Sequence, residues 1–300
     1  MAQKALRVAN GLQLALTKEC LQKAAEGFKQ NPRQLLFYNP IKYEVRHAFP
    51  ASKFSLYSQE INGTTYWLGN VSNKLTRDTP VFAYSGEYNE NDFLQAFEEF
   101  KDTNELFKRR TVPMMVGEKK ITDTIYAYVS QHDDNVGKQS YPCYLFYMTD
   151  EQMKKIMQER LHVPEGYTIG TPNLEQEARC MTGTWSYGDD GDIELTREKI
   201  RRLPSVCVRK DGQMVGFYML ESLGWLNHHF VFNEHRGKGL GKLLELAQVQ
   251  NCIRAGMRVY KLVELSNLPT VEASKRSPYW TLAKDENGQE IIVEYMDMYK

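Results

Sequence analysis

The residues best suited to chemistry in this sequence are glycines and basic residues in one short stretch, residues 231–245, which reads VFNEHRGKGLGKLLE. Three glycines and the basic side chains of Arg236, Lys238 and Lys242 lie between an apolar run and a stretch with helical spacing. The first turn of a helix offers unpaired backbone N–H groups and a partial positive charge, and glycine lets a ligand approach the backbone closely. This stretch therefore predicts a site for a phosphate-like anion.

Two common phosphate-binding motifs do not fit the spacing of this loop. A P-loop requires G-x-x-x-x-G-K-[ST], but Arg236 occupies the position of the first glycine and Leu243 the position of the hydroxyl residue. A dinucleotide fingerprint requires G-x-G-x-x-G, and counted from Gly239 its third glycine falls on Leu244. The pattern that does fit is R-x-x-G-x-G.

The loop needs a strand before it and a helix after it, and the flanking residues predict both. WLNHHFVF (225–232) is typical of a strand, and residues 239–256 carry apolar side chains on one side of a helix that Gly256 ends. Further elements are expected on both sides of this unit. They are helices at 174–185, 195–203 and 269–277, two strands within 205–222 joined by a turn at Asp211-Gly212, and strands at 258–267 and 290–299.

The preceding half of the chain also mixes strands and helices. Alternating apolar residues on both sides of Asn62-Gly63 predict a hairpin over 54–71. The other expected elements are helical spacing up to about residue 34, strands at 80–85 and 141–149, and helices at 89–110 and 150–161. The Pro/Gly-rich stretch 162–173 is the expected boundary, so we predict α/β domains at 1–161 and 162–300.

Bulk composition excludes several classes of protein. The chain has 300 residues, 42% of them hydrophobic, which is enough for one large or two ordinary domains with real cores. Lys+Arg and Asp+Glu both number 38, and this balance argues against a dedicated nucleic-acid binder. No apolar run is long enough to cross a membrane. The five cysteines form no CxxC pair and predict reduced thiols in an intracellular protein.

The loop and its neighbours together resemble a known family. VFNEHRGKGLG (231–241) resembles the pattern V-x-P-E-x-R-G-K-G-x-G, which holds the coenzyme-A pyrophosphate in the GCN5-related N-acetyltransferase (GNAT) superfamily, with Asn233 where proline is usual. The segments GTWSYGDDG (183–191), RRLPSVCVRKDGQMVGF (201–217) and VYKLVELSN (259–267) resemble the C-terminal domain of glycine N-acyltransferases. The resemblance covers about residues 165–285 and is weaker in the first half.

This resemblance implies a fold, a co-substrate and its binding residues. The C-terminal domain should have the GNAT-type mixed, mostly antiparallel sheet flanked by helices, and a degenerate copy of that fold is one alternative for the N-terminal domain. The implied activity is transfer of an acyl group from acyl-CoA to a small amine or amino acid such as glycine. A backbone N–H near 230–232 would polarise the thioester oxygen. The residues implied to bind the coenzyme are Phe230, Val231, Phe232, Arg236, Gly237, Lys238, Gly239, Leu240, Gly241, Lys242 and Asn267.

The general base is where the sequence departs from the family. A glutamate is expected eleven residues before the loop arginine, but Trp225 stands there. Strand alternation puts 225, 227 and 229 on one face unless a bulge intervenes, which makes the imidazole of His229 the best substitute. His228 should point the other way. Glu221 is a further candidate base, although a solvated strand end or ordinary packing is an alternative for each of these residues.

The remaining candidates are few. By resemblance, Tyr279 would protonate the leaving thiolate, with a core aromatic beside Trp280 as the alternative. A metal site at His228 and His229 is not expected, because adjacent strand residues diverge and no third ligand has suitable spacing. Because a tryptophan replaces the expected base, a non-catalytic acyl-CoA-binding protein is the competing function. We expect a cytoplasmic protein; Lys4, Arg7 and Lys18 without any acid in the first 18 residues leave a mitochondrial location open.

Overall fold

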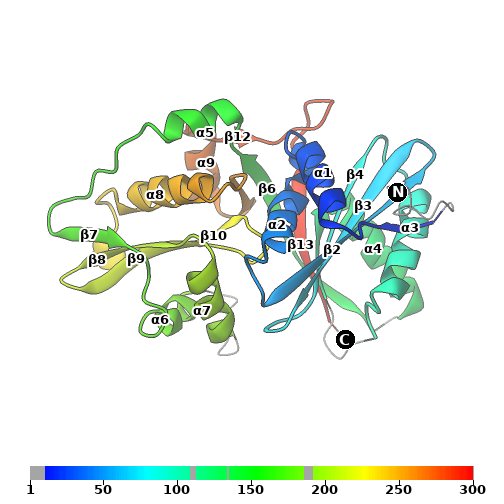
Figure 1. Ribbon diagram of the computed structural model, residues 1–300, viewed down its shortest axis with the longest axis horizontal. Coiled ribbons are helices and arrows are strands. Elements are labelled where there is room, and N and C mark those ends of the chain that lie inside the picture. The colour runs from blue at the N-terminus through cyan, green and yellow to red at the C-terminus, as the bar shows by residue number, and fades with distance from the viewer. Residues whose placement is uncertain (1–10, 109–112, 134, 186–191, 300) are drawn as a thin grey trace.

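The computed structural model describes residues 11–108, 113–133, 135–185 and 192–299. All strands of these residues belong to one mixed, mostly antiparallel sheet, and helices cover both of its faces (Figure 1). The strands lie in the order β1-β2-β3-β4-β5-β13-β6-β11-β10-β9-β8-β7, with β12 paired to β6. The predicted α/β class and mixed sheet are confirmed.

The chain runs twice through a similar series of elements. The first half contains β1 (Gln13–Leu14), α1 (Lys18–Phe28), the 3-10 helix η1 (Pro32–Gln34), α2 (Leu35–Arg46), β2 (Ser52–Ile61), β3 (Thr64–Asn73), β4 (Thr79–Ser85), α3 (Glu90–Thr103), β5 (Met114–Glu118), α4 (Lys119–His132) and β6 (Gly137–Tyr147). After α5 (Asp150–Ile156), the second half contains β7 (Tyr167–Gly170), α6 (Ala178–Gly183), α7 (Asp192–Arg202), β8 (Val206–Lys210), β9 (Gln213–Leu220), β10 (Leu226–Val231), the 3-10 helix η2 (Asn233–His235), α8 (Leu240–Arg254), β11 (Tyr260–Glu264), α9 (Leu268–Arg276), β12 (Thr281–Leu282) and β13 (Ile292–Tyr299).

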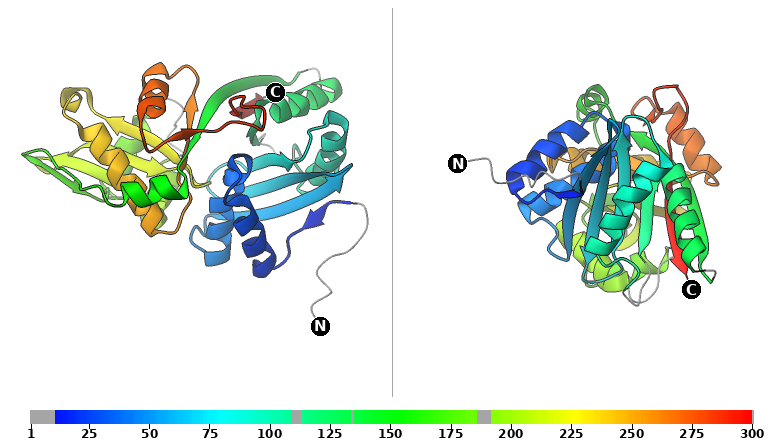
Figure 2. Two further views of the ribbon diagram at one scale, coloured as in Figure 1. Left: turned by 90° about the horizontal axis from the view of Figure 1, so that it is seen from above. Right: turned by 90° about the vertical axis from the view of Figure 1, so that its right-hand side faces the viewer.

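The two halves are joined by an exchange of their last long strands. Strand β13 of the second half pairs with β5 of the first half, at Tyr295 and Val116, and β6 of the first half pairs with β11 of the second, at Leu145 and Leu262. The two exchanged strands also pair with each other, at Tyr295 and Tyr141. In Figure 2 the red strand β13 accordingly lies against elements of the first half. The sheet is therefore continuous across the predicted boundary at residue 162, and the division into two domains stays a prediction.

Helices pack on both faces of the second half of the sheet. Leu243, Leu244 and Ala247 of α8 share a hydrophobic core with Tyr218 and Leu220 of β9. Ala178, Met181 and Ile200 of α6 and α7 share another core with Phe217 and Met219. Successive strand residues point to opposite faces, so Phe217 marks the α7 face of the sheet and Tyr218 marks the α8 face.

Local turn chemistry accounts for the predictions that are confirmed. Asn62 and Gly63 have φ angles of 50° and 79° between β2 and β3, and Asp211 and Gly212 have 50° and 79° between β8 and β9. These left-handed conformations are the ones that a two-residue hairpin turn requires. Gly256, with φ 73°, follows the end of α8 as predicted.

Several parts of the fold differ from the prediction, and no element was expected where β5 and α4 lie. The expected break 162–173 contains the strand β7, which pairs with β8 as the last strand of the sheet. Helix α2 was not predicted. It carries Pro40 within it, a residue that ordinarily ends or kinks a helix, and most of its residues are buried. In the described ranges, no helix is long and apolar enough to span a bilayer.

Candidate functional site

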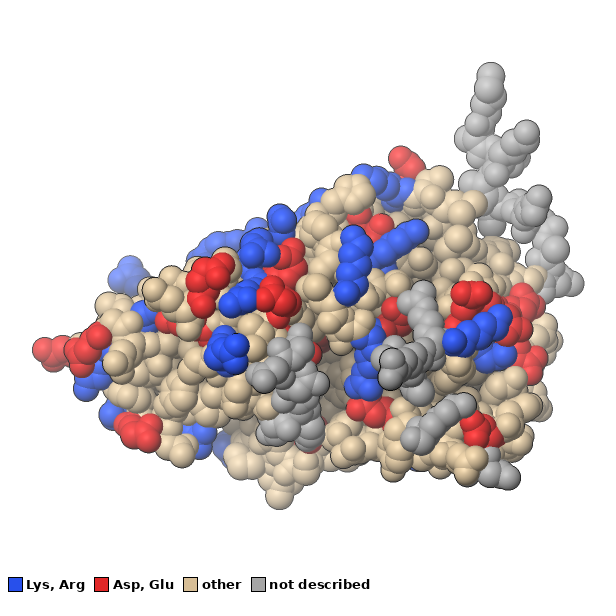
Figure 3. Space-filling view, turned by 90° about the horizontal axis from the view of Figure 1, so that it is seen from below, with Lys and Arg blue, Asp and Glu red and all other residues tan. Residues whose placement is uncertain are grey.

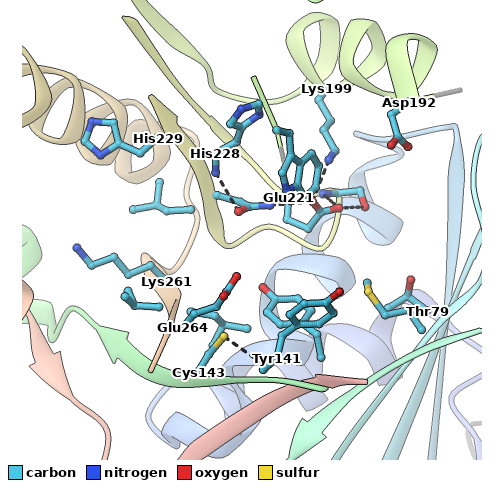
Figure 4. A pocket seen from close by; sticks show the side chains of 18 of the residues that line it. Thr79, Tyr141, Cys143, Asp192, Lys199, Glu221, His228, His229, Lys261 and Glu264 are labelled. Carbon is cyan, nitrogen blue, oxygen red and sulfur yellow. Dashed lines mark hydrogen bonds and ion pairs between the residues drawn. The ribbon is translucent and has the colours of Figure 1, made fainter. Parts of the chain in front are cut away.

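The site begins where two parallel strands separate. Strands β10 and β11 pair at one position among the described residues, Leu226 with Lys261, whereas β10 pairs with β9 over most of its length. Beyond Leu226 the two strands diverge, so the facing backbone groups of β10 and β11 have no partner across the gap. A cavity of 590 Å³ occupies this region and is lined by residues from both halves of the chain (Figure 4). Figure 3 shows the molecule hollowed between the two halves on the face that carries α6 and α7.

A β-bulge in β10 decides which side chains face each side of the cavity. The register shifts between Asn227, which pairs with Met219, and His229, which pairs with Tyr218. His228 is the extra residue and has the left-handed φ of 56°. The side chain of Asn227 accepts the His228 backbone N–H at 2.9 Å and so supplies a partner that the interrupted ladder lacks. The expectation that 225, 227 and 229 share one face is therefore wrong, because the bulge puts 227 on the α7 face and His229 on the α8 face.

His229 lies over the first turn of α8. Its ring stacks on Tyr218, with centroids 4.2 Å apart, and a β-carbon at Gly241 would lie 3.7 Å from its Nε2 atom. Many protein atoms surround this side chain, but one side of it is open to the cavity, so the residue is exposed. Burial lowers the pKa of His229 to about 4, the nearby Glu245 carboxylate opposes the shift, and Lys261 adds to it. His229 is therefore neutral at pH 7.

A buried polar cluster next to His229 was not predicted from the sequence. Lys261 of β11 pairs with Glu245 of α8 at 2.6 Å, and its ammonium lies 4.1 Å from the centroid of the Trp280 ring. The indole N–H of Trp280 also donates to Glu245, at 3.2 Å. The sequence signal was weak, because Glu245 falls within a helix and Lys261 within a strand, where single charged residues usually face solvent.

Glu221 lies on the other side of the cavity as a fully bonded carboxylate. Its oxygens accept from Lys199 at 2.9 Å, from the Ser222 N–H at 2.9 Å and hydroxyl at 2.8 Å, and from Asn227 at 3.2 Å. Burial alone would raise the pKa of this carboxyl, but Lys199 and the Ser222 hydrogen bonds more than offset it and hold the pKa below its usual value. The two oxygens already accept four hydrogen bonds, so this carboxylate has no free position for a substrate proton. Its evident effect is to tie the end of β9 to α7.

The loop after β10 is open in the way an anion site requires. Gly237 and Gly239 have φ angles of 76° and 79°, and Gly239 is the N-cap of α8 with no side-chain cap among the described residues. The Arg236 Nε donates to the Val231 carbonyl at 2.8 Å, and the Lys238 ammonium donates to the Glu234 carbonyl at 3.0 Å. Residues 236–239 and Lys242 are exposed, so the basic side chains at the start of α8 are accessible to an anion. The binding of coenzyme A by this loop stays a prediction.

The first half provides an internal comparison for this loop. Helix α3 follows β4 as α8 follows β10, and β4 and β5 likewise form one parallel pair, Val81 with Val116. The N-terminus of α3, however, is capped by the side chain of Asn89 and carries Glu90 and Asp92 in its first turn. The Asn89 side chain occupies a backbone N–H that an anion would use, and the two carboxylates would repel the anion. Only the second of the two corresponding helix starts is therefore suited to a phosphate.

Three predicted residues of β10 and its extension differ in their backbone bonding. The N–H of Phe232 already donates to the Val215 carbonyl at 3.0 Å, so it is not free to polarise a thioester oxygen. Because N–H groups alternate between the two edges of a strand, the N–H of Val231 points to the β11 side, where the gap lies. Phe230 lies on the α7 face beside Phe217, with ring centroids 6.0 Å apart, and under the Arg236 guanidinium.

The other predicted residues divide between the cavity and its surroundings. Asn267 lines the cavity and also caps α9, accepting the Thr270 N–H at 3.4 Å. Tyr279 is not among the residues that line the cavity, and its hydroxyl donates to Glu159 at 2.5 Å. Trp225, in the position of the expected base, is fully buried and packs against Tyr295 at 5.6 Å. In the described ranges, no cluster of three or more His, Cys, Asp or Glu side chains could hold a metal.

Comparison with known proteins gives the fold a name. No protein-family model matches the chain, and no curated protein does. Among solved structures, a Drosophila melanogaster protein from a structural genomics consortium superposes with a TM-score of 0.74 at 13% identity, over 97% of this chain and 99% of that one. A tandem GNAT protein from the clavulanic acid biosynthesis pathway superposes with a TM-score of 0.52 at 13% identity, over 96% of this chain and 98% of that one. The chain therefore has the GNAT fold, as predicted for its second half.

Proposed function

We propose that this protein binds an acyl-CoA thioester at residues 236–242 and transfers its acyl group to the amine of a small acceptor. The observation that carries the proposal is the continuity of the site. A cavity between β10 and β11 is lined by residues from both faces of the sheet, and His229, one of these residues, lies against Gly241 in the first turn of the uncapped helix α8. A co-substrate with an anionic end and a long narrow arm matches this arrangement.

In this proposal the two substrates approach from opposite faces of the sheet. The pyrophosphate would lie at the α8 end, against the first-turn N–H groups and Arg236, Lys238 and Lys242. The arm would follow the unpaired edge of β10 through the gap, where the N–H of Val231 can polarise the thioester oxygen. The acyl carbon would then emerge towards the α7 face, where Asn227, Lys199 and Glu264 line the cavity and the acceptor would enter.

Support for the reaction class comes from two directions. One structural neighbour is a tandem GNAT protein described without acetyl-CoA, which is a thioester of the proposed kind. The sequence resemblance to glycine N-acyltransferases favours an amino acid such as glycine as acceptor. Neither a nucleic acid nor a membrane is part of the proposed reaction. The absence of the family's glutamate at Trp225 leaves one competing function, an acyl-CoA-binding protein without transferase activity.

Two measurements separate these functions. Isothermal titration with coenzyme A should show binding by the wild-type protein, and absence of binding would refute both functions. Release of free thiol from a panel of acyl-CoAs should depend on the presence of an amine, with Arg236→Glu as the binding-deficient control. Tight coenzyme binding without amine-dependent thiol release from any pair would instead establish the binding protein.

A further inference from the structure

Among the described non-glycine residues that line the cavity, only His228 has a left-handed backbone conformation. Its φ of 56° is unfavourable for a residue with a β-carbon, and such conformations persist where the surrounding structure holds them. Here the bulge and the hydrogen bond from its own N–H to Asn227 hold the backbone. The result is that His228 and His229, although adjacent, point to opposite faces of the sheet (Figure 4).

The imidazole of His228 is fixed by a hydrogen-bond chain that selects one tautomer. The Thr184 hydroxyl lies 3.0 Å from Nε2 of His228 and 2.8 Å from the Met181 carbonyl. A carbonyl oxygen can only accept, so Thr184 donates its single proton to Met181 and must accept from His228. Nε2 therefore carries the proton, and Nδ1 keeps an unshared electron pair with no hydrogen-bond donor in the described part of the chain.

The surroundings keep this ring in place and uncharged. It packs edge-on against Phe217, with centroids 4.7 Å apart, and lies 5.5 Å from the Trp185 ring. Burial and, to a lesser extent, Lys199 lower the pKa of His228 to about 4, although Glu221 opposes the shift. Asp192 of α7 and Glu264 of β11 line the same cavity. At pH 7 the ring is thus a neutral, oriented proton acceptor.

On the proposed acyl transfer, on which this inference rests, we propose that His228 is the general base and that Thr184 is its positioning residue. The amine nitrogen attacks the thioester carbon, and a C–N bond forms as the carbonyl electrons move to oxygen. Nδ1 of His228 takes the proton from that nitrogen. When the C–S bond breaks, the proton passes to the thiolate, which leaves neutral coenzyme A thiol, an amide and an unprotonated imidazole.

His229 is less well placed for this proton transfer. It lies on the α8 face over the first turn of α8, the side on which the pyrophosphate and the coenzyme arm would enter. A base must reach the acceptor nitrogen, which approaches from the other face. The face assignment thus reverses the order of the two histidines that strand alternation suggested, because the bulge interrupts that alternation.

His228→Gly tests the role without straining the fold, because glycine favours the left-handed backbone that His228 occupies. We expect kcat to fall about 10²- to 10⁴-fold, with the coenzyme A Kd unchanged within about twofold. Imidazole added to the buffer should restore part of the lost rate in His228→Gly and should leave the rate of the wild-type protein unchanged. A kcat within about threefold of wild type, or a loss that imidazole does not restore, would overturn the assignment.

Thr184→Val and its conservative partner Thr184→Ser test the hydrogen-bond chain. Valine should lower kcat without changing KM for acyl-CoA, whereas serine, which keeps the hydroxyl, should retain the wild-type rate. Nitrogen NMR of the wild-type protein should show His228 with a protonated Nε2, and a protonated Nδ1 would refute the role whether or not the protein is active. Wild-type protein that binds coenzyme A but releases no thiol with any amine contradicts the transferase function itself and, with it, this role. Active wild-type protein with a fully active His228→Gly variant contradicts the base assignment alone.

Discussion

Gly239→Asp should weaken coenzyme A binding through one added charge at a known place. Gly239 is the N-cap of α8, and a β-carbon there would meet no atom within 4 Å, so an aspartate fits without a clash. Its carboxylate would lie roughly 5 Å from an anion on the first turn of the helix and would compete for the same N–H groups.

The size of the effect follows from the charges involved. At roughly 5 Å and an effective dielectric constant of about 20–40, one carboxylate and one phosphate charge repel by about 1.7–3.3 kcal/mol. That energy corresponds to roughly 20- to 300-fold weaker binding. The loop is exposed, so salt screening favours the lower end of the range, and the effect should shrink as salt is raised.

The matched control is Gly63→Asp in the β2–β3 hairpin. Gly63 has the same φ of 79° and the same open surroundings, so this variant shares the backbone strain and the change in net charge. Isothermal titration of both variants at two salt concentrations, with thermal unfolding to confirm folding, completes the comparison. Unchanged affinity in Gly239→Asp, or equal weakening in Gly63→Asp, would refute the placement of the pyrophosphate.

Three further predictions concern stability, pH and the proposed acid. Lys199→Met should destabilise the fold by about 3–5 kcal/mol in urea unfolding at pH 7, because it leaves the buried Glu221 carboxylate without its partner. This loss should shrink as the pH is lowered from 7 towards 4, because burial without Lys199 raises the pKa of the Glu221 carboxyl and the variant then holds it protonated in that range; a constant difference would argue against the ion pair as its cause. The wild-type unfolding temperature should fall as pH decreases from 7 to 4.5, since the folded pKa of His228 and His229 is about 4 and the unfolded chain binds more protons over that range. His228→Asn should flatten this dependence, and an unaltered slope would contradict the low pKa. Tyr279→Phe should change kcat less than about threefold, because the hydroxyl bonds to Glu159 outside the cavity; a loss above about tenfold would restore Tyr279 as the acid.

The sequence predicted those parts of the fold whose signal is local. The turns at Asn62-Gly63 and Asp211-Gly212 and the end of α8 at Gly256 follow from left-handed backbone positions that few residues adopt. The loop 236–242 was found because glycines and basic residues at fixed spacing are visible in one short segment. Helix α2 was missed because Pro40 lies within it, where a proline ordinarily argues against a helix interior.

The parts that could not be predicted depend on contacts between distant residues. No sequence pattern in β10 predicts the extra residue at His228, because the bulge is defined by how β10 pairs with β9. The ion pair between Glu245 and Lys261 forms only because α8 packs beside β11 in the folded protein. The pairing of β13 with β5 likewise cannot be read from either strand, because both have ordinary apolar patterns. Charged or polar residues at such places look like surface residues until the tertiary fold is known.

The strand exchange has a consequence for how the chain acquires its structure during synthesis. Between β5 and its neighbour β13 lie roughly 170 residues, which take on the order of 10–35 s to translate at about 5–20 residues per second. During that interval β13 cannot pair with β5, so the edge of β5 that β13 later covers lacks its final partner strand. An unpaired edge invites association with other chains. The sheet of the first half therefore cannot be completed until β13 has been synthesised. We expect the nascent chain to depend on chaperones until β13 has emerged from the ribosome.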